Sequence, residues 1–124
     1  MADIRLIRDA EAPWEEVSAA WKANQRAGDP GLRFKRLLPS APGMPNLQRT
    51  EYRPHHHEAP HSHPEDEIIF VLGGRLFFGR EELGFGDAIF VPQGKTYSLR
   101  TDEAGAQFVR VGLSDLRGGN GEED

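Results

Sequence analysis

Fourteen residues decide the fold: His61-Ser62-His63-Pro64-Glu65-Asp66-Glu67-Ile68-Ile69-Phe70-Val71-Leu72-Gly73-Gly74. In an extended chain, residues two apart point to the same side, so the imidazoles of His61 and His63 should project side by side. The apolar run from residue 67 to 72 is typical of a buried strand, and the two glycines that follow it indicate a turn. Glu67 begins that strand, where a carboxylate is costly unless another charge compensates it. Two histidines and one carboxylate are the ligand set of non-haem iron centres and can also hold zinc or manganese.

The segments on either side of this stretch read as further short strands. Alternating or continuous apolar runs predict strands over residues 32–38, 47–53, 76–78, 88–91, 96–100 and 107–113, separated by glycine- and proline-rich turns. Residues 10–28 predict the one α-helix, with Trp14, Val17 and Trp21 on one stripe and Gly28 as its stop. We therefore expect an all-β antiparallel barrel over residues 32–113, preceded by a helical extension over 1–31. The glycine-rich acidic residues 114–124 are expected to form a disordered tail.

Composition excludes several classes of protein. The 124 residues fit one domain, and the absence of cysteine excludes disulfides, thiolate zinc sites and a cysteine nucleophile. A net charge of −5 disfavours nucleic-acid binding. No apolar run is long enough to cross a bilayer and no secretory signal is recognisable, so we expect no membrane partner and a cytoplasmic location.

Two linked motifs resemble those of the cupins. His61-x-His63-x3-Glu67-x6-Gly74 is similar to the first cupin motif, and Gly86-x5-Pro92-x-Gly94 is similar to the front of the second. The resemblance covers roughly residues 45–113. A polar surface loop is the alternative interpretation of the histidine segment, and the second motif disfavours it.

The resemblance implies a jelly-roll barrel, also called a double-stranded β-helix, with a divalent transition metal such as Fe, Zn, Mn or Ni inside it. It implies His61, His63 and Glu67 as ligands and a homodimer as the assembly. A metal-dependent enzyme of dioxygenase, isomerase, lyase or cyclase type, acting on a small organic molecule, is the first functional hypothesis. A non-catalytic module that binds or senses a metal or small molecule is the alternative. Phe108, Phe78, Phe90 and Phe70 or its neighbours are expected to line the interior.

The sequence departs from the cupin pattern at its fourth ligand. Where the second motif usually supplies a histidine, this chain has Tyr97, which should face inward. Tyr97 is a candidate phenolate ligand, a candidate hydrogen-bond donor or proton-transfer group near the metal, or a structural tyrosine. The three consecutive histidines His55, His56 and His57 either form a solvated segment or supply the missing ligand or a substrate contact.

Overall fold

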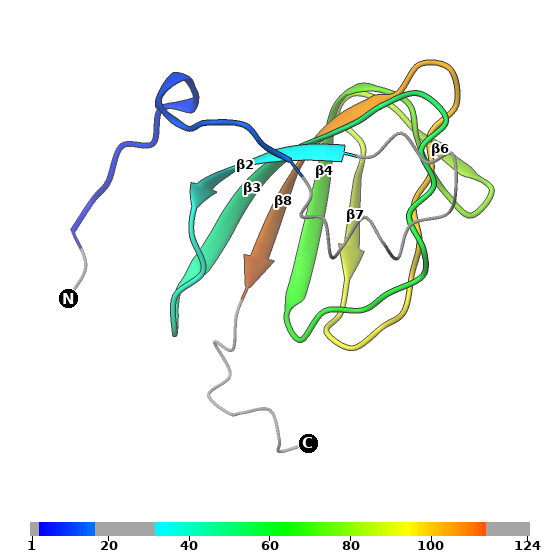
Figure 1. Ribbon diagram of the computed structural model, residues 1–124. Coiled ribbons are helices and arrows are strands. Elements are labelled where there is room, and N and C mark those ends of the chain that lie inside the picture. Colours follow the sequence, from blue (N-terminus) through cyan, green and yellow to red (C-terminus); the bar gives the residue numbers. More distant parts are fainter. Residues whose placement is uncertain (1–2, 17–31, 114–124) are drawn as a thin grey trace.

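The computed structural model describes residues 3–16 and 32–113, and within them the protein is an antiparallel β structure (Figure 1). The strands β1 to β8 are Glu15–Glu16, Leu32–Leu38, Pro45–Tyr52, Asp66–Gly74, Leu76–Phe78, Glu81–Leu83, Ala88–Val91 and Ala106–Leu113. Six of them form one sheet in the order β1-β2-β3-β8-β4-β7, and β5 pairs with β6 in a second sheet. Every pairing is antiparallel. The predicted all-β jelly-roll barrel is confirmed.

Strand β4 lies between β8 and β7 and shows why the sequence forms this sheet. Its side chains alternate: Glu67, Ile69 and Val71 are buried, whereas Ile68 and Phe70 are exposed. Such alternation is what a strand with one face on a core requires. The inner face joins a core built from residues of several strands and of one loop: Tyr52, Leu76, Leu83, Val91, Tyr97, Leu99, Ala106 and Phe108. This inner face also carries the candidate site.

The segment predicted as a strand over residues 96–100 closes the barrel without forming a continuous strand. It makes single bridges, from Tyr97 to His61 and from Arg100 to both His57 and Phe77. Tyr97 and Leu99 are buried, so the alternation that suggested a strand does reflect an inner and an outer side. These bridges go to three separate residues, His57, His61 and Phe77, and none of them extends into a ladder.

The prediction of an N-terminal helix over residues 10–28 is wrong for the first residues of that segment. Asp9–Glu11 forms one 3₁₀ turn, η1, and Glu15–Glu16 pairs with β2 as strand β1. Ala12 precedes Pro13 and is extended (φ −95°, ψ 127°), as steric contact with the proline ring demands. Contacts with the sheet fix this extended path, because Lys35 donates hydrogen bonds to Asp9 and the Arg33 guanidinium stacks on the Trp14 ring at 4.0 Å. The remainder of that prediction, and the predicted tail, lie outside the described residues.

The phenylalanines divide between the two faces of the sheet. Phe108 is buried and lines the interior, whereas Phe70, Phe78 and Phe90 are 39%, 37% and 59% exposed. The prediction that Phe78 and Phe90 line the barrel is therefore wrong, and beside Phe70 it is the neighbours Ile69 and Val71 that face inward. A continuous apolar run does not reveal which alternate residues face the core.

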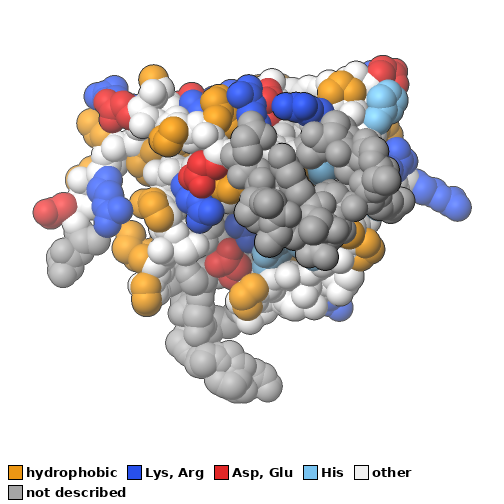
Figure 2. All heavy atoms as spheres, in the orientation of Figure 1, with side chains coloured by type: hydrophobic (Ala, Val, Ile, Leu, Met, Phe, Trp, Pro, Cys, Tyr) orange, Lys and Arg blue, Asp and Glu red, His pale blue; other side chains and the backbone are white. Residues whose placement is uncertain are grey.

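The surface in Figure 2 carries basic, acidic and hydrophobic side chains interspersed on the visible face. Among the described residues, no helix is long and apolar enough to cross a membrane.

Candidate metal and ligand site

The two histidines of the first motif lie on a segment that is held by the loop opposite. The backbone N–H of His61 donates to the carbonyl of Tyr97 at 3.0 Å, and the N–H of Tyr97 donates to the carbonyl of His61 at 2.9 Å. The rings of His61 and His63 lie edge to face with their centroids 4.8 Å apart. The extended geometry therefore brings both imidazoles to one place, as their spacing predicts.

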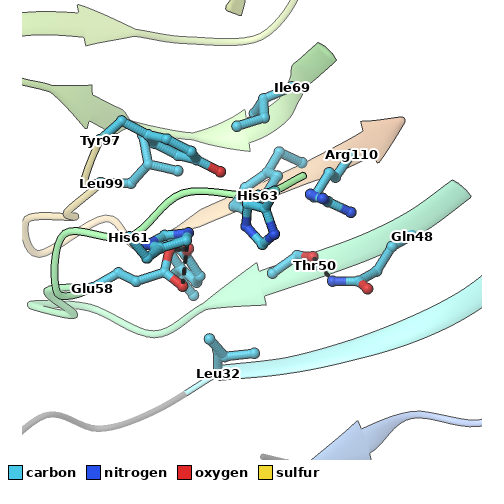
Figure 3. Close-up of a pocket in the computed structure, with 12 residues that line it drawn as sticks. Leu32, Gln48, Thr50, Glu58, His61, His63, Ile69, Tyr97, Leu99 and Arg110 are labelled. Carbon is cyan, nitrogen blue, oxygen red and sulfur yellow. Dashed lines mark hydrogen bonds and ion pairs between the residues drawn. The ribbon is translucent and has the colours of Figure 1, made fainter. Parts of the chain in front are cut away.

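Both imidazoles line a cavity of about 120 Å³ in the barrel (Figure 3). Its walls combine polar and apolar side chains from β2, β3, β4, β8 and the two facing loops: Leu32, Gln48, Thr50, Tyr52, Glu58, Ile69, Tyr97, Leu99, Phe108 and Arg110. In Figure 3, His61 and Glu58 lie at one end, Arg110 at the other, and His63 between them. A concave site with a few convergent polar groups is the usual form of a small-molecule pocket.

Glu67 is fully buried, and its charge is compensated by an arginine. Its Oε2 accepts a hydrogen bond from Arg110 Nε at 2.6 Å, and its Oε1 accepts one from the Tyr97 hydroxyl at 2.6 Å. His63 Nε2 lies 3.3 Å from Oε2. The reasoning that a metal must balance this carboxylate is therefore incomplete, because β8 supplies a guanidinium to it.

Arg110 is the centre of a small ionic network that sequence analysis missed. Besides Glu67 it contacts Glu65 at 2.9 Å and Asn46 at 3.5 Å. Burial by itself would lower the pKa of Arg110, but the carboxylates of Glu67 and Glu65 outweigh it and raise that pKa. Arg110 lies two residues after Phe108, so strand alternation places both side chains on the inner face, and the register of β8 against β4, with Arg110 opposite Ile69, brings the guanidinium beside Glu67.

Tyr97 is buried and lines the cavity, and its hydroxyl acts as a donor to Glu67. Burial raises the pKa of Tyr97, and the hydrogen bond to the Glu67 carboxylate raises it further. The hydroxyl therefore positions the Glu67 carboxylate, and the three roles expected for Tyr97 at a metal stay predictions.

Glu58 is a carboxylate of the cavity lining that sequence analysis did not single out. Its Oε1 accepts a hydrogen bond from the Tyr52 hydroxyl, and its Oε2 lies 3.9 Å from His61 Nε2. Burial raises the pKa of Glu58, and the neighbouring His61 and the Tyr52 hydroxyl oppose that shift. The sequence around it, between a histidine triplet and Pro60, gives no periodic pattern that would have predicted its direction.

The histidine triplet lies away from the cavity lining. His55 is exposed with φ 59°, and His56 is buried beside the Tyr52 ring at 4.3 Å, with its N–H donating to Thr101 Oγ1. His57 forms the bridge to Arg100. These positions do not support the hypothesis that one of the three replaces the missing fourth ligand.

The donor set at the cavity fits a divalent transition metal. The Nδ1 of His61 lies 2.9 Å from the carbonyl of Ala59, which favours the tautomer with a free electron pair on Nε2. Imidazole nitrogens with one carboxylate suit Fe, Zn, Mn or Ni. Among the described residues, no three His, Asp or Glu side chains already converge as closely as a formed metal site requires.

The barrel, the cavity and the paired histidines define a small jelly-roll protein with a polar interior site. A family model described as "Cupin domain" matches residues 48–111, and the chain belongs to this family. No curated protein matches the chain significantly.

Solved structures similar to this chain have diverse descriptions, and several are described as cupins. The polyketide cyclase RemF from Streptomyces resistomycificus is 24% identical (TM-score 0.70; 91% of this chain and 81% of RemF covered). A predicted oxalate decarboxylase from Thermotoga maritima is 22% identical (TM-score 0.68; 90% and 100% covered). KdgF from Halomonas sp. is 17% identical (TM-score 0.67; 90% and 96% covered). At these identities the likeness shows the fold alone.

Proposed function

We propose that the chain binds a divalent transition metal through His61 and His63 and is an enzyme that acts on a small organic molecule in the cavity. One observation carries the proposal: two imidazoles 4.8 Å apart line a cavity beside more acidic than basic charge. Glu65 and Glu67 pair with a single guanidinium, that of Arg110, and Glu58 lies beside His61 at the other end of the cavity (Figure 3). With all three carboxylates ionised the cluster carries two excess negative charges, and a divalent cation would balance them.

The chain's own residues would do three things around such a metal. His61 and His63 would hold it, with Glu67 as the carboxylate that the family motif implies. Tyr97 would position Glu67 through its hydroxyl, and the apolar wall of Ile69 and its neighbours would exclude water from the substrate. The metal would supply Lewis-acid activation of a substrate oxygen, the chemistry common to isomerases, lyases and cyclases, or open positions for dioxygen.

Metal content of the untagged protein tests the proposal. We expect about one equivalent of Fe, Zn, Mn or Ni per chain, and its loss in His61→Ala. His55→Asn is the matched control, since His55 is exposed away from the cavity lining and asparagine tolerates its positive φ. If wild type and His61→Ala both lack stoichiometric metal, the metal-dependent function is wrong.

The non-catalytic alternative rests on Tyr97, which stands where the family pattern has a fourth ligand. A metal-loaded protein that binds small carboxylates or phenols without converting them would favour this binding role. In a ferric sample, a phenolate-to-iron charge-transfer band would identify Tyr97 as a ligand. Absence of the band would leave it as a donor to Glu67.

We propose a homodimer that pairs through the outer face of the sheet. One row of apolar residues crosses five strands in register: Leu38, Leu47, Val111, Ile68 and Phe90. The row is about 19 Å long at the usual strand spacing, and at its β7 end Phe90 is 59% exposed. That length suits the apolar centre of a standard interface, and a second copy offers the same row. Light scattering that shows only monomer at micromolar concentration would refute it.

A further inference from the structure

Two carboxylates beside the paired histidines lie in contrasting surroundings: Glu58 lines the cavity, whereas Glu67 is fully buried and is not part of the lining. Both oxygens of Glu67 already accept strong hydrogen bonds, from Tyr97 at 2.6 Å and from Arg110 Nε at 2.6 Å. Each of these donors is fixed: Tyr97 by its backbone bridge to His61, and Arg110 by its further contacts on Glu65 and Asn46. A metal cation that binds Glu67 must bind an oxygen that already accepts a hydrogen bond, and it must lie beside the positively charged Arg110 guanidinium, which repels it.

Glu58 has no such cation beside it. Within residues 3–16 and 32–113, Glu58 forms no ion pair with a lysine or arginine; its only ion-pair partner is His61. The Tyr52 hydroxyl occupies Oε1, which leaves Oε2 directed toward His61 Nε2. The backbone N–H of Glu58 donates to the Leu99 carbonyl at 2.9 Å, so the residue is held in place at the cavity wall.

The two histidines are each anchored on one nitrogen. Ala59 O engages Nδ1 of His61, and Glu67 Oε2 lies 3.3 Å from Nε2 of His63. A metal-binding histidine characteristically donates its other ring N–H to a carbonyl or carboxylate, which orients the ring. Glu67 suits that supporting role for His63, whereas the free Nε2 of His61 faces Glu58.

We infer that Glu58, and not the motif residue Glu67, is the carboxylate ligand of the metal held by His61 and His63. The inference rests on the proposed function. Two ligands of one metal at about 2.1 Å and ordinary angles are roughly 3.0–3.4 Å apart. The observed 3.9 Å between His61 Nε2 and Glu58 Oε2 is longer than this, so the two side chains would move closer on metal binding, and His63 would bind through Nδ1 because Glu67 engages its Nε2. Glu67 is a positioning residue that orients His63 and accepts from Tyr97 and Arg110.

Titration with Co²⁺ separates the two carboxylates, with isothermal calorimetry for affinity and the visible Co²⁺ spectrum for coordination. Glu58→Gln should weaken Co²⁺ binding at least 100-fold and change the visible band. Glu67→Gln should keep the band and weaken binding by no more than about the 10–100-fold typical of residues that support a ligand. Glu51→Gln is the matched control, because Glu51 pairs with Arg33 away from the cavity lining.

The results distinguish this inference from the proposed function. If wild type binds Co²⁺, His61→Ala does not, and Glu58→Gln binds within threefold of wild type with an unchanged band, the inference is overturned while the metal site stands. If wild type itself binds no Co²⁺, Zn²⁺ or Mn²⁺, both are overturned. Should Glu67→Gln fail to fold, Glu58→Asp provides the second variant: it should retain Co²⁺ with a shifted band, and an unshifted band would count against ligation by Glu58.

Discussion

Replacing Arg110 by methionine tests the charge balance of the buried site most directly. Methionine approximates the arginine stem but removes the guanidinium, which leaves Glu67 fully buried with the Tyr97 hydroxyl as its hydrogen-bond donor. Breaking a buried pair by removal of one partner costs about 3–5 kcal/mol. Two charge-assisted hydrogen bonds at roughly 1.5–3 kcal/mol each give a similar figure. Because the Arg110 side chain is only 14% exposed, solvent screening should reduce this value little.

Urea denaturation of the metal-free protein at neutral pH measures the effect. We expect Arg110→Met to lower the free energy of unfolding by about 3–5 kcal/mol, or roughly 10–20 °C in Tm for a chain of this size. Arg75→Met is the control: its solvent-exposed pairs with Asp102 and Glu103 are screened by water, so this change should leave the free energy of unfolding nearly unchanged.

A double variant identifies the cause of the loss. Adding Glu67→Gln to Arg110→Met removes the stranded charge, so much of the lost stability should return. A loss below about 1 kcal/mol in the single variant, or no recovery in the double variant, would show that Arg110 does not neutralise Glu67.

Three further predictions concern the rest of the fold. Gly74→Ala should destabilise the protein by several kcal/mol in thermal melts, because the φ of Gly74 is +71° and a Cβ would overlap the Gly105 carbonyl. Gly79→Ala is the control: Gly79 has φ +61° but lies in open space, so its replacement should cost only about 1 kcal/mol. Equal losses in the two variants would refute this. The pKa of Asp9 is lowered by hydrogen bonds from Arg49 and Lys35, so its stabilising contribution is present at neutral pH and lost as pH falls below the ordinary 3.8. The NMR signal of the Trp14 indole should therefore shift as the pH falls below 3.8. In Asp9→Asn the same shift should already be present at pH 7. A Trp14 signal that does not depend on pH would contradict this role of Asp9. Phe90→Glu should give monomers in light scattering without lowering Tm, and an unchanged dimer would place the interface elsewhere.

The fold was predictable because alternation and turn chemistry agree along most of the chain. Residues 32–38, 76–78 and 88–91 were predicted as strands with the bounds that the structure shows. The N-terminal segment was mispredicted because Trp14 and Pro13 satisfy a helical pattern as well as an extended one. What decides between them is tertiary: the sheet offers Lys35, Arg33 and Arg49 as partners for Asp9 and Trp14, and no local pattern contains that information.

The site was only partly predictable for a similar reason. His61 and His63 share one segment, so their proximity follows from spacing alone. Arg110 comes to Glu67 from 43 residues away, through the register of β8 on β4. Glu58 reaches the cavity because its loop bonds to Leu99 and its side chain to Tyr52, contacts that depend on the closed barrel.

Tyr97 and Arg110 act on the same carboxylate from two sides, and this links the stability of the barrel to the choice of metal ligand. A histidine at position 97 would compete for a metal, whereas the tyrosine donates to Glu67 and leaves that carboxylate an acceptor of two fixed donors. Glu58, beside the free nitrogen of His61, is then the carboxylate whose negative charge remains available to a cation. If Arg110→Met in the metal-free protein proves costly because Glu67 is stranded, Glu67 cannot also be the unneutralised carboxylate that draws a metal, and Glu58 is the group left to do so. The unfolding of Arg110→Met and the Co²⁺ titration of Glu58→Gln thus test one distribution of charge by independent measurements.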